Sequence, residues 1–183
     1  MKKLPLLALL LVVLAACKLD PVDDRWEYYK EWREESEAWL KAMTDSTNED
    51  GTPYFHKVIS EYDKNAYVLM HYFNDRNETA NNLRPLATSV VDVKYYLRLH
   101  NGTPADSSYL STTPADSVVR FDLGGSLIDG YRVALMDMHV GDSVDVIVPF
   151  QSGYGVMGKG TVLPYSNLKF SIKLVDIYEY ENQ

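Results

Sequence analysis

The chain has 183 residues, of which 46% are hydrophobic and 24% are charged, and its formal net charge at pH 7 is −8. The length from Cys17 onward suits one ordinary domain plus an extension. The acidic balance argues against nucleic acid as a partner, because a phosphate backbone repels a negatively charged surface.

The first residues are typical of an export signal. Two lysines precede an apolar run from Leu4 to Ala16, which is shorter than the roughly 20 residues that a membrane-spanning helix needs. We therefore interpret residues 1–16 as a signal peptide. Leu14 to Cys17 resembles the lipobox of bacterial lipoproteins, and Cys17 is the only cysteine in the chain. The resemblance implies that Cys17 carries the lipid; an ordinary secretory signal with a nearby cysteine is the alternative.

A lipidated Cys17 would place the protein in the cell envelope, where we expect the outer membrane, facing the periplasm or the surface. Asp23-Asp24 resembles the acidic export signal of some surface lipoproteins of the Bacteroidota. Because an acidic protein is repelled by anionic lipid, the acyl chains would have to hold it on the membrane.

Residues 17–53 are predicted to form a lipidated tether, an amphipathic helix and a polar linker. From Trp26 to Met43, tryptophan, tyrosine and alanine recur at roughly every third or fourth position, which is the spacing of one helix face. This helix either packs on its own domain or docks a partner or a second copy. The sequence leaves both alternatives open, and the oligomeric state with them.

Residues 54–89 are predicted to contain two strands and a loop. The strand-like runs are Tyr54–Ser60 and Tyr67–Phe73. The polar, turn-rich segment Asn74–Ser89 contains Pro85, which would break a helix.

The clearest strand pattern begins at Val90. Alternate residues are apolar from Val91 to Leu99, from Val144 to Val148 and from Leu168 to Leu174, as in strands with one buried face. Tyr131–His139 is the one convincing helix between them. Residues 90–178 are therefore predicted to be an α+β domain, an antiparallel β-sheet wrapped around one short α-helix.

Several patterns in this region are not expected to carry chemistry. Thr103–Ser107 recurs as Thr113–Ser117, which we interpret as a local duplication inside a long loop. Gly153–Gly158 satisfies a dinucleotide-binding pattern, but Lys159–Pro164 cannot begin the helix that such a site requires. The four histidines are scattered without the spacing of paired ligands, so we expect no metal and no cofactor.

Four segments in order resemble the FKBP-type peptidyl-prolyl cis-trans isomerase family. Together they span about residues 90–177, and each has plausible spacing to the next. They are Val93–Tyr95 with Asp106–Ser108; Phe121–Gly124 with Leu127–Tyr131; Leu135–Gly141; and Val148–Pro149 with Tyr154–Gly155, Leu163–Pro164 and Asn167–Phe170.

The resemblance implies an isomerase that acts on proline-containing polypeptides and assists the folding of exported proteins. It also implies a substrate pocket with apolar walls and floor and a few hydrogen-bond donors, the Ile128 backbone N–H and the Tyr154 hydroxyl. The residues expected to form this pocket are Tyr95, Asp106, Leu127, Ile128, Tyr131, Tyr154 and Phe170.

Three departures from the family pattern imply a wider pocket. Ala105 stands where the family has phenylalanine, Tyr131 where it usually has tryptophan on the floor, and Val119 where it has a wall aromatic. Asp116, in the second copy of the duplication, competes with Asp106 for the pocket carboxylate, and we expect Asp106 from its distance after the Asn-Gly turn. A non-catalytic peptide- or partner-binding module is therefore the alternative function. A structural envelope component that works through the N-terminal helix is a third.

Overall fold

The structure is a computed structural model that describes residues 21–178. The predicted signal peptide and Cys17 lie outside the described residues. The chain divides into two compact units, Met1–Lys30 and Glu31–Gln183. The predicted amphipathic helix is present as two helices, α2 (Pro21–Tyr28) and α3 (Lys30–Thr44). No helix in residues 21–178 is long and apolar enough to cross a membrane.

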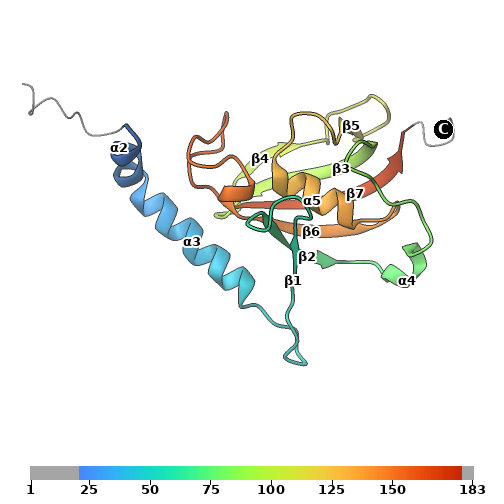
Figure 1. Ribbon diagram of the computed structural model, residues 1–183, viewed down its shortest axis with the longest axis horizontal. Helices are drawn as coiled ribbons and strands as arrows, with labels where there is room; N and C mark the ends of the chain where they lie inside the picture. Colours follow the sequence, from blue (N-terminus) through green and yellow to red (C-terminus); the bar gives the residue numbers. More distant parts are fainter. Residues whose placement is uncertain (1–20, 179–183) are drawn as a thin grey trace, which may run out of the picture. The chain divides into compact units, whose positions relative to one another are not determined.

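The second unit is built on one antiparallel sheet of seven strands. The strands lie in the order β1-β2-β6-β7-β3-β4, and β5 pairs with β3. Helix α5 (Asp129–Asp137) lies across one face of this sheet (Figure 1). The predicted α+β fold is therefore confirmed. The strands are β1 (His56–Ile59), β2 (Tyr67–Tyr72), β3 (Val90–Leu99), β4 (Pro104–Ser107), β5 (Val119–Asp122), β6 (Ser143–Val148) and β7 (Leu168–Ile177).

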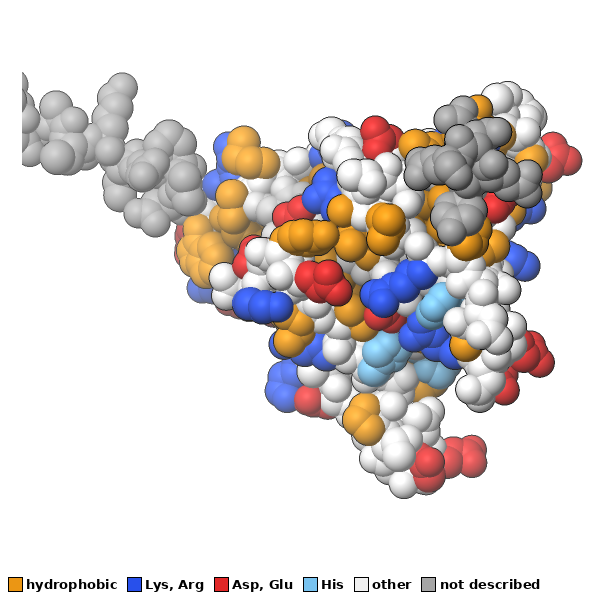
Figure 2. Space-filling model, turned by 45° about the vertical axis from the view of Figure 1, so that its right-hand side comes forward, with side chains coloured by type: hydrophobic (Ala, Val, Ile, Leu, Met, Phe, Trp, Pro, Cys, Tyr) orange, Lys and Arg blue, Asp and Glu red, His pale blue; other side chains and the backbone are white. Residues whose placement is uncertain are grey.

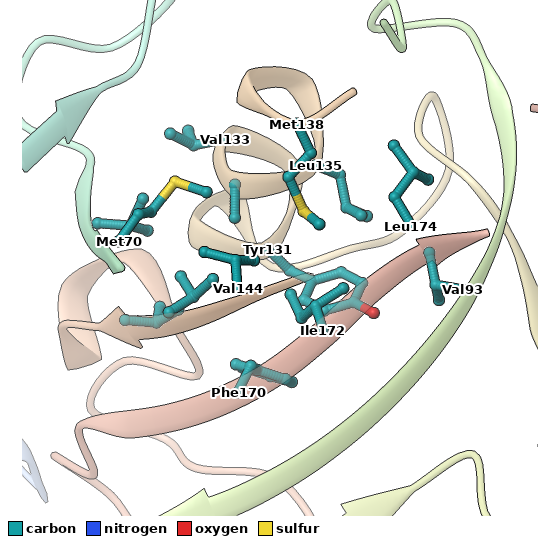
Figure 3. Packing of buried hydrophobic residues seen from close by; sticks show 14 of the residues in the cluster. Met70, Val93, Tyr131, Val133, Leu135, Met138, Val144, Phe170, Ile172 and Leu174 are labelled. Carbon is teal, nitrogen blue, oxygen red and sulfur yellow. The ribbon is translucent and has the colours of Figure 1, made fainter. Parts of the chain in front are cut away.

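The alternating residues of β3, β6 and β7 form the core beneath α5, as predicted. Figure 3 shows Tyr131 and Leu135 of α5 above Phe170 and Ile172 of β7, and all four are buried. The helix approaches the sheet closely at Gly130, where an added Cβ would lie 2.3 Å from Val148 Cγ1. A side chain at this position would push α5, and the residues just before it, away from the sheet.

The other face of the sheet is covered by α3 over β2 and β6. Ile147 and Leu69 are buried there, and Trp39 packs against them. Ser36 and Asn167 join α3 to the start of β7 by two hydrogen bonds, Asn167 N to Ser36 Oγ (2.9 Å) and Asn167 Nδ2 to Ser36 O (2.7 Å). Within the second unit, α3 therefore packs on its own domain, the first of the two alternatives.

Three segments differ from their prediction. Residues 54–89 were set apart from residues 90–178, but the sheet includes both, because β2 pairs with β6. A short helix, α4 (Arg76–Thr79), forms in the segment predicted to lack one, because the Asp75 side chain caps it by accepting from Asn77 N. The first copy of the duplication is strand β4 rather than loop, because it pairs with β3.

Candidate active site

A pocket of about 470 Å³ lies beside the N-terminus of α5. The chain brings its lining together from distant segments: β3, β4, β5 and β7 of the sheet, α5 and the turn before it, and the loop that follows β6. The seven residues predicted from the sequence all line this pocket: Tyr95, Asp106, Leu127, Ile128, Tyr131, Tyr154 and Phe170.

The floor of the pocket is aromatic. The Tyr131 ring lies 4.9 Å from the Phe170 ring and 5.6 Å from the Phe121 ring, measured between centroids. The Tyr95 ring is the fourth member of this aromatic group, and its centroid lies 6.1 Å from that of Tyr131. Figure 3 shows the Tyr131 ring above Phe170 on the sheet. Such a floor provides a flat apolar surface of the kind on which a proline ring can rest.

The polar rim is organised around Asp106. Its Oδ2 accepts a hydrogen bond from the Tyr95 hydroxyl at 2.8 Å, and its Oδ1 accepts one from Ser107 N at 2.8 Å. Burial raises the pKa of Tyr95 above its ordinary value, and the hydrogen bond to Asp106 is the second-largest cause of this increase. Tyr95 therefore stays a neutral donor and holds the carboxylate in one orientation at the edge of the pocket.

Tyr154 offers a second hydroxyl to the pocket. Burial raises its pKa, and the negative charge of Asp106 raises it further, so the phenol keeps its proton at neutral pH. No residue in the described part of the chain accepts a hydrogen bond from this hydroxyl. Tyr154 can therefore donate to a ligand.

The Ile128 backbone provides a third polar group. Ile128 is the N-cap residue of α5, with φ −66° and ψ 143°. Its carbonyl accepts from Tyr131 N (3.1 Å) and Arg132 N (3.2 Å). Its N–H has no acceptor among residues 21–178, and the positive end of the helix dipole lies at the same position. A substrate carbonyl in the pocket can accept from it.

The pocket wall differs from the prediction at one side. Phe121 lines the pocket, whereas Val119, the position of the expected wall, does not. Phe121 was recognised in the sequence only as part of a fold motif, although both residues point to the same face of β5 and either could have been the wall. Ala105 packs against the core. Neither Ala105 nor Asp116 lines the pocket, and Asp106 does.

The histidines are less scattered in space than in the sequence. Figure 2 shows histidine side chains gathered beside basic ones on one face. Arg76 Nη2 lies 3.2 Å from His139 Nδ1. Among the described residues, no group of three or more histidine, cysteine, aspartate or glutamate side chains could hold a metal ion.

An antiparallel sheet wrapped on one helix, with an aromatic pocket and unpaired donors at the helix N-terminus, is the architecture of a proline-binding isomerase domain. The family model for FKBP-type peptidyl-prolyl cis-trans isomerases matches residues 82–175, and the chain belongs to this family. The enzyme class predicted from the sequence is thereby confirmed at the level of the family.

Relatives of the chain are described as peptidyl-prolyl cis-trans isomerases or as FK506-binding proteins. The chain is 28% identical over 158 residues to the FKBP-type 22 kDa peptidyl-prolyl cis-trans isomerase of Escherichia coli, covering 86% of this chain and 74% of that protein. It is 35% identical over 94 residues to the peptidyl-prolyl cis-trans isomerase Mip of Coxiella burnetii, covering 51% of this chain and 39% of that protein. It is 33% identical over 91 residues to the FK506-binding protein of Neisseria meningitidis, covering 49% of this chain and 80% of that protein.

Two solved structures share the fold. A peptidyl-prolyl cis-trans isomerase from Pseudomonas syringae superposes with a TM-score of 0.55 at 22% identity, covering 87% of this chain and 98% of that one. FkpA from Escherichia coli superposes with a TM-score of 0.56 at 22% identity, covering 85% of this chain and 60% of that one.

Proposed function

We propose that this chain catalyses cis–trans isomerisation of X-Pro bonds in exported polypeptides, with the proline ring on the Tyr131 floor. The observation that carries the proposal is the pair of unused donors at one pocket. The Ile128 N–H and the Tyr154 hydroxyl both line it, and neither donates to a described residue.

The reaction requires no nucleophile. The C–N bond resists rotation by about 18–20 kcal/mol, because resonance gives it partial double-bond character. An apolar pocket disfavours the charge-separated planar amide, and donors that fit the twisted amide lower the barrier. In this pocket, Ile128 N–H and Tyr154 would hold the substrate carbonyls, and Tyr95 would fix Asp106 at the rim.

We further propose that the protein works at the cell envelope, anchored by lipid on Cys17. The run from Leu4 to Ala16 and the sequence Leu14–Cys17 support this placement. Expression with radiolabelled palmitate tests it: the wild-type chain should carry label and fractionate with membranes, and a Cys17→Ser variant should carry none. Unlabelled wild-type protein in the soluble fraction would contradict the anchor.

Isomerase activity is best tested by NMR exchange on short X-Pro peptides, with the full chain purified in detergent. We expect wild-type protein to accelerate exchange and a Tyr154→Phe, Asp106→Ala variant to lose most of that acceleration. The matched control is Tyr109→Phe, Asp116→Ala, which makes the same two chemical changes at exposed positions outside the pocket. Equal loss in both variants would contradict the assigned site.

The alternative is a binding module that has kept the pocket without catalysis, and Tyr131 on the floor is the observation that favours it. No acceleration by folded wild-type protein, together with saturable binding of an X-Pro peptide, would establish this alternative and overturn the isomerase.

A further inference from the structure

A second groove, of about 460 Å³, follows the outward-facing side of α5. Asp129, Arg132 and Met136 lie on that side of the helix, at the spacing of one helix face. The hairpin between β1 and β2, from Ile59 to Asp63, lines the groove beside them. No step of the proposed reaction uses this groove.

The groove combines exposed apolar side chains with two carboxylates, Glu61 and Asp63, that form no ion pair with another described residue. Ile59 is 49% exposed and Tyr62 is 74% exposed. Large apolar side chains that cluster on a surface usually mark a binding site. The groove also has two cations. Arg132 is ion-paired with Asp129 at 3.1 Å and donates to the carbonyls of Leu123 and Gly125. Arg84 donates to Met136 O. The carboxylates of Glu61 and Asp63 also line the groove. A ligand with apolar and basic residues would complement this surface.

The groove adjoins the isomerase pocket at the N-terminus of α5. Asp129, the first residue of α5, lines both of them. The helix rises about 1.5 Å per residue, so the groove extends about 12 Å from this junction along α5. That length holds about four residues of an extended chain, at about 3.3 Å each.

The β1 side of the groove also offers free backbone groups. β1 is an edge strand. Ser60 N donates to Ala66 O at 2.9 Å, and Ile59 is the next residue in the ladder, opposite Tyr67. Because residues in an antiparallel pair alternate between facing the partner and facing away, the Ile59 N–H and C=O point to the open edge. An extended segment can pair with them.

We propose that this groove binds an extended segment of the same polypeptide whose X-Pro bond lies in the pocket. It is a client-binding subsite that selects apolar and basic residues within about four positions of the proline, on one side of it. This inference rests on the proposed function, because the pocket defines where the client enters the groove.

The test compares a short and a long substrate in the full chain. The short one is an X-Pro tetrapeptide, and the long ones add four apolar and basic residues either before or after it. We expect wild-type protein to isomerise one long peptide with a kcat/KM about tenfold higher than that of the tetrapeptide. An Ile59→Ser, Tyr62→Ala variant should lose this gain and keep its activity on the tetrapeptide.

The control variant is Tyr109→Ala, Leu110→Ser, which removes an exposed tyrosine and an exposed aliphatic residue, 76% and 86% exposed, from outside both sites. It should retain the gain. Equal kcat/KM for the short and long peptides in wild type, or equal loss in the control, would overturn the subsite.

Fluorescence polarisation with the labelled long peptide separates this proposal from the proposed function. If neither peptide is isomerised but the long peptide binds and the Ile59, Tyr62 variant loses that binding, the isomerase fails and the subsite stands. If both peptides are isomerised equally and bind equally, the subsite fails and the isomerase stands.

Discussion

Replacing Asn167 by alanine should destabilise the domain by about 3 kcal/mol. The Asn167 side chain is fully buried. It accepts from Phe150 N (2.8 Å) and donates to Ser36 O (2.7 Å). Alanine leaves the Phe150 N–H without a partner, which costs about 1–3 kcal/mol. It also removes a second hydrogen bond, worth about 1 kcal/mol, from Ser36 O, which keeps its helical donor within α3. The same change frees the segment that carries Tyr154, because Phe150 O accepts from Gly155 N (2.9 Å).

Urea unfolding followed by tryptophan fluorescence measures the effect as a lower midpoint with an unchanged slope. The control is Asn82→Ala, which removes one exposed hydrogen bond to Val140 O (2.8 Å) and should cost less than about 0.5 kcal/mol. Where Asn167→Ala is still folded, its kcat/KM on a short X-Pro peptide should also fall, since Tyr154 loses its support. A loss of stability no larger than that of Asn82→Ala would refute the reasoning.

Two further predictions concern buried polar groups. The Tyr131 hydroxyl has no hydrogen-bond partner in the described part of the chain. Tyr131→Phe should therefore leave the free energy of unfolding unchanged or raise it by up to about 1 kcal/mol. A drop in the urea midpoint would contradict this prediction, because it would show that the hydroxyl has a partner. Burial lowers the pKa of His100, and Glu35, with Oε2 3.8 Å from its Nε2, offsets this only in part. The unfolded chain therefore binds more protons at this residue, and its contribution to stability is lost as the pH falls below about 6.5 towards the lowered folded pKa. His100→Phe, which keeps a ring against Trp32, should lose less stability than wild type between pH 8 and pH 5, and equal losses would contradict the assignment.

The strands and the core could be predicted because their signal is local. Alternation from Val91 to Leu99 is visible in nine residues, and the faces that it predicts are the buried ones. The pairing of β2 with β6 joins segments about 75 residues apart, and no local pattern encodes it. The burial of Ile147 on the other face of β6 is likewise not encoded locally, because it depends on α3 covering that face.

The candidate site was predictable as far as the family motifs extend. Those motifs named seven residues that the fold brings to one pocket. Phe121 was not among them, because the choice between two residues on the same face of β5 depends on how that strand approaches Tyr131. The groove along α5 was not predicted either, because it depends on where the β1–β2 hairpin lies in space, which the sequence pattern does not state.

The central claim is that a substrate carbonyl binds the Ile128 N–H in the pocket, and ¹H–¹⁵N NMR titration with a short X-Pro peptide tests it most directly. We expect the Ile128 amide signal to be among the most strongly shifted, and to shift little with a peptide in which alanine replaces proline. An unmoved Ile128 amide at saturating X-Pro peptide, with the largest shifts at residues outside the pocket, would contradict the account.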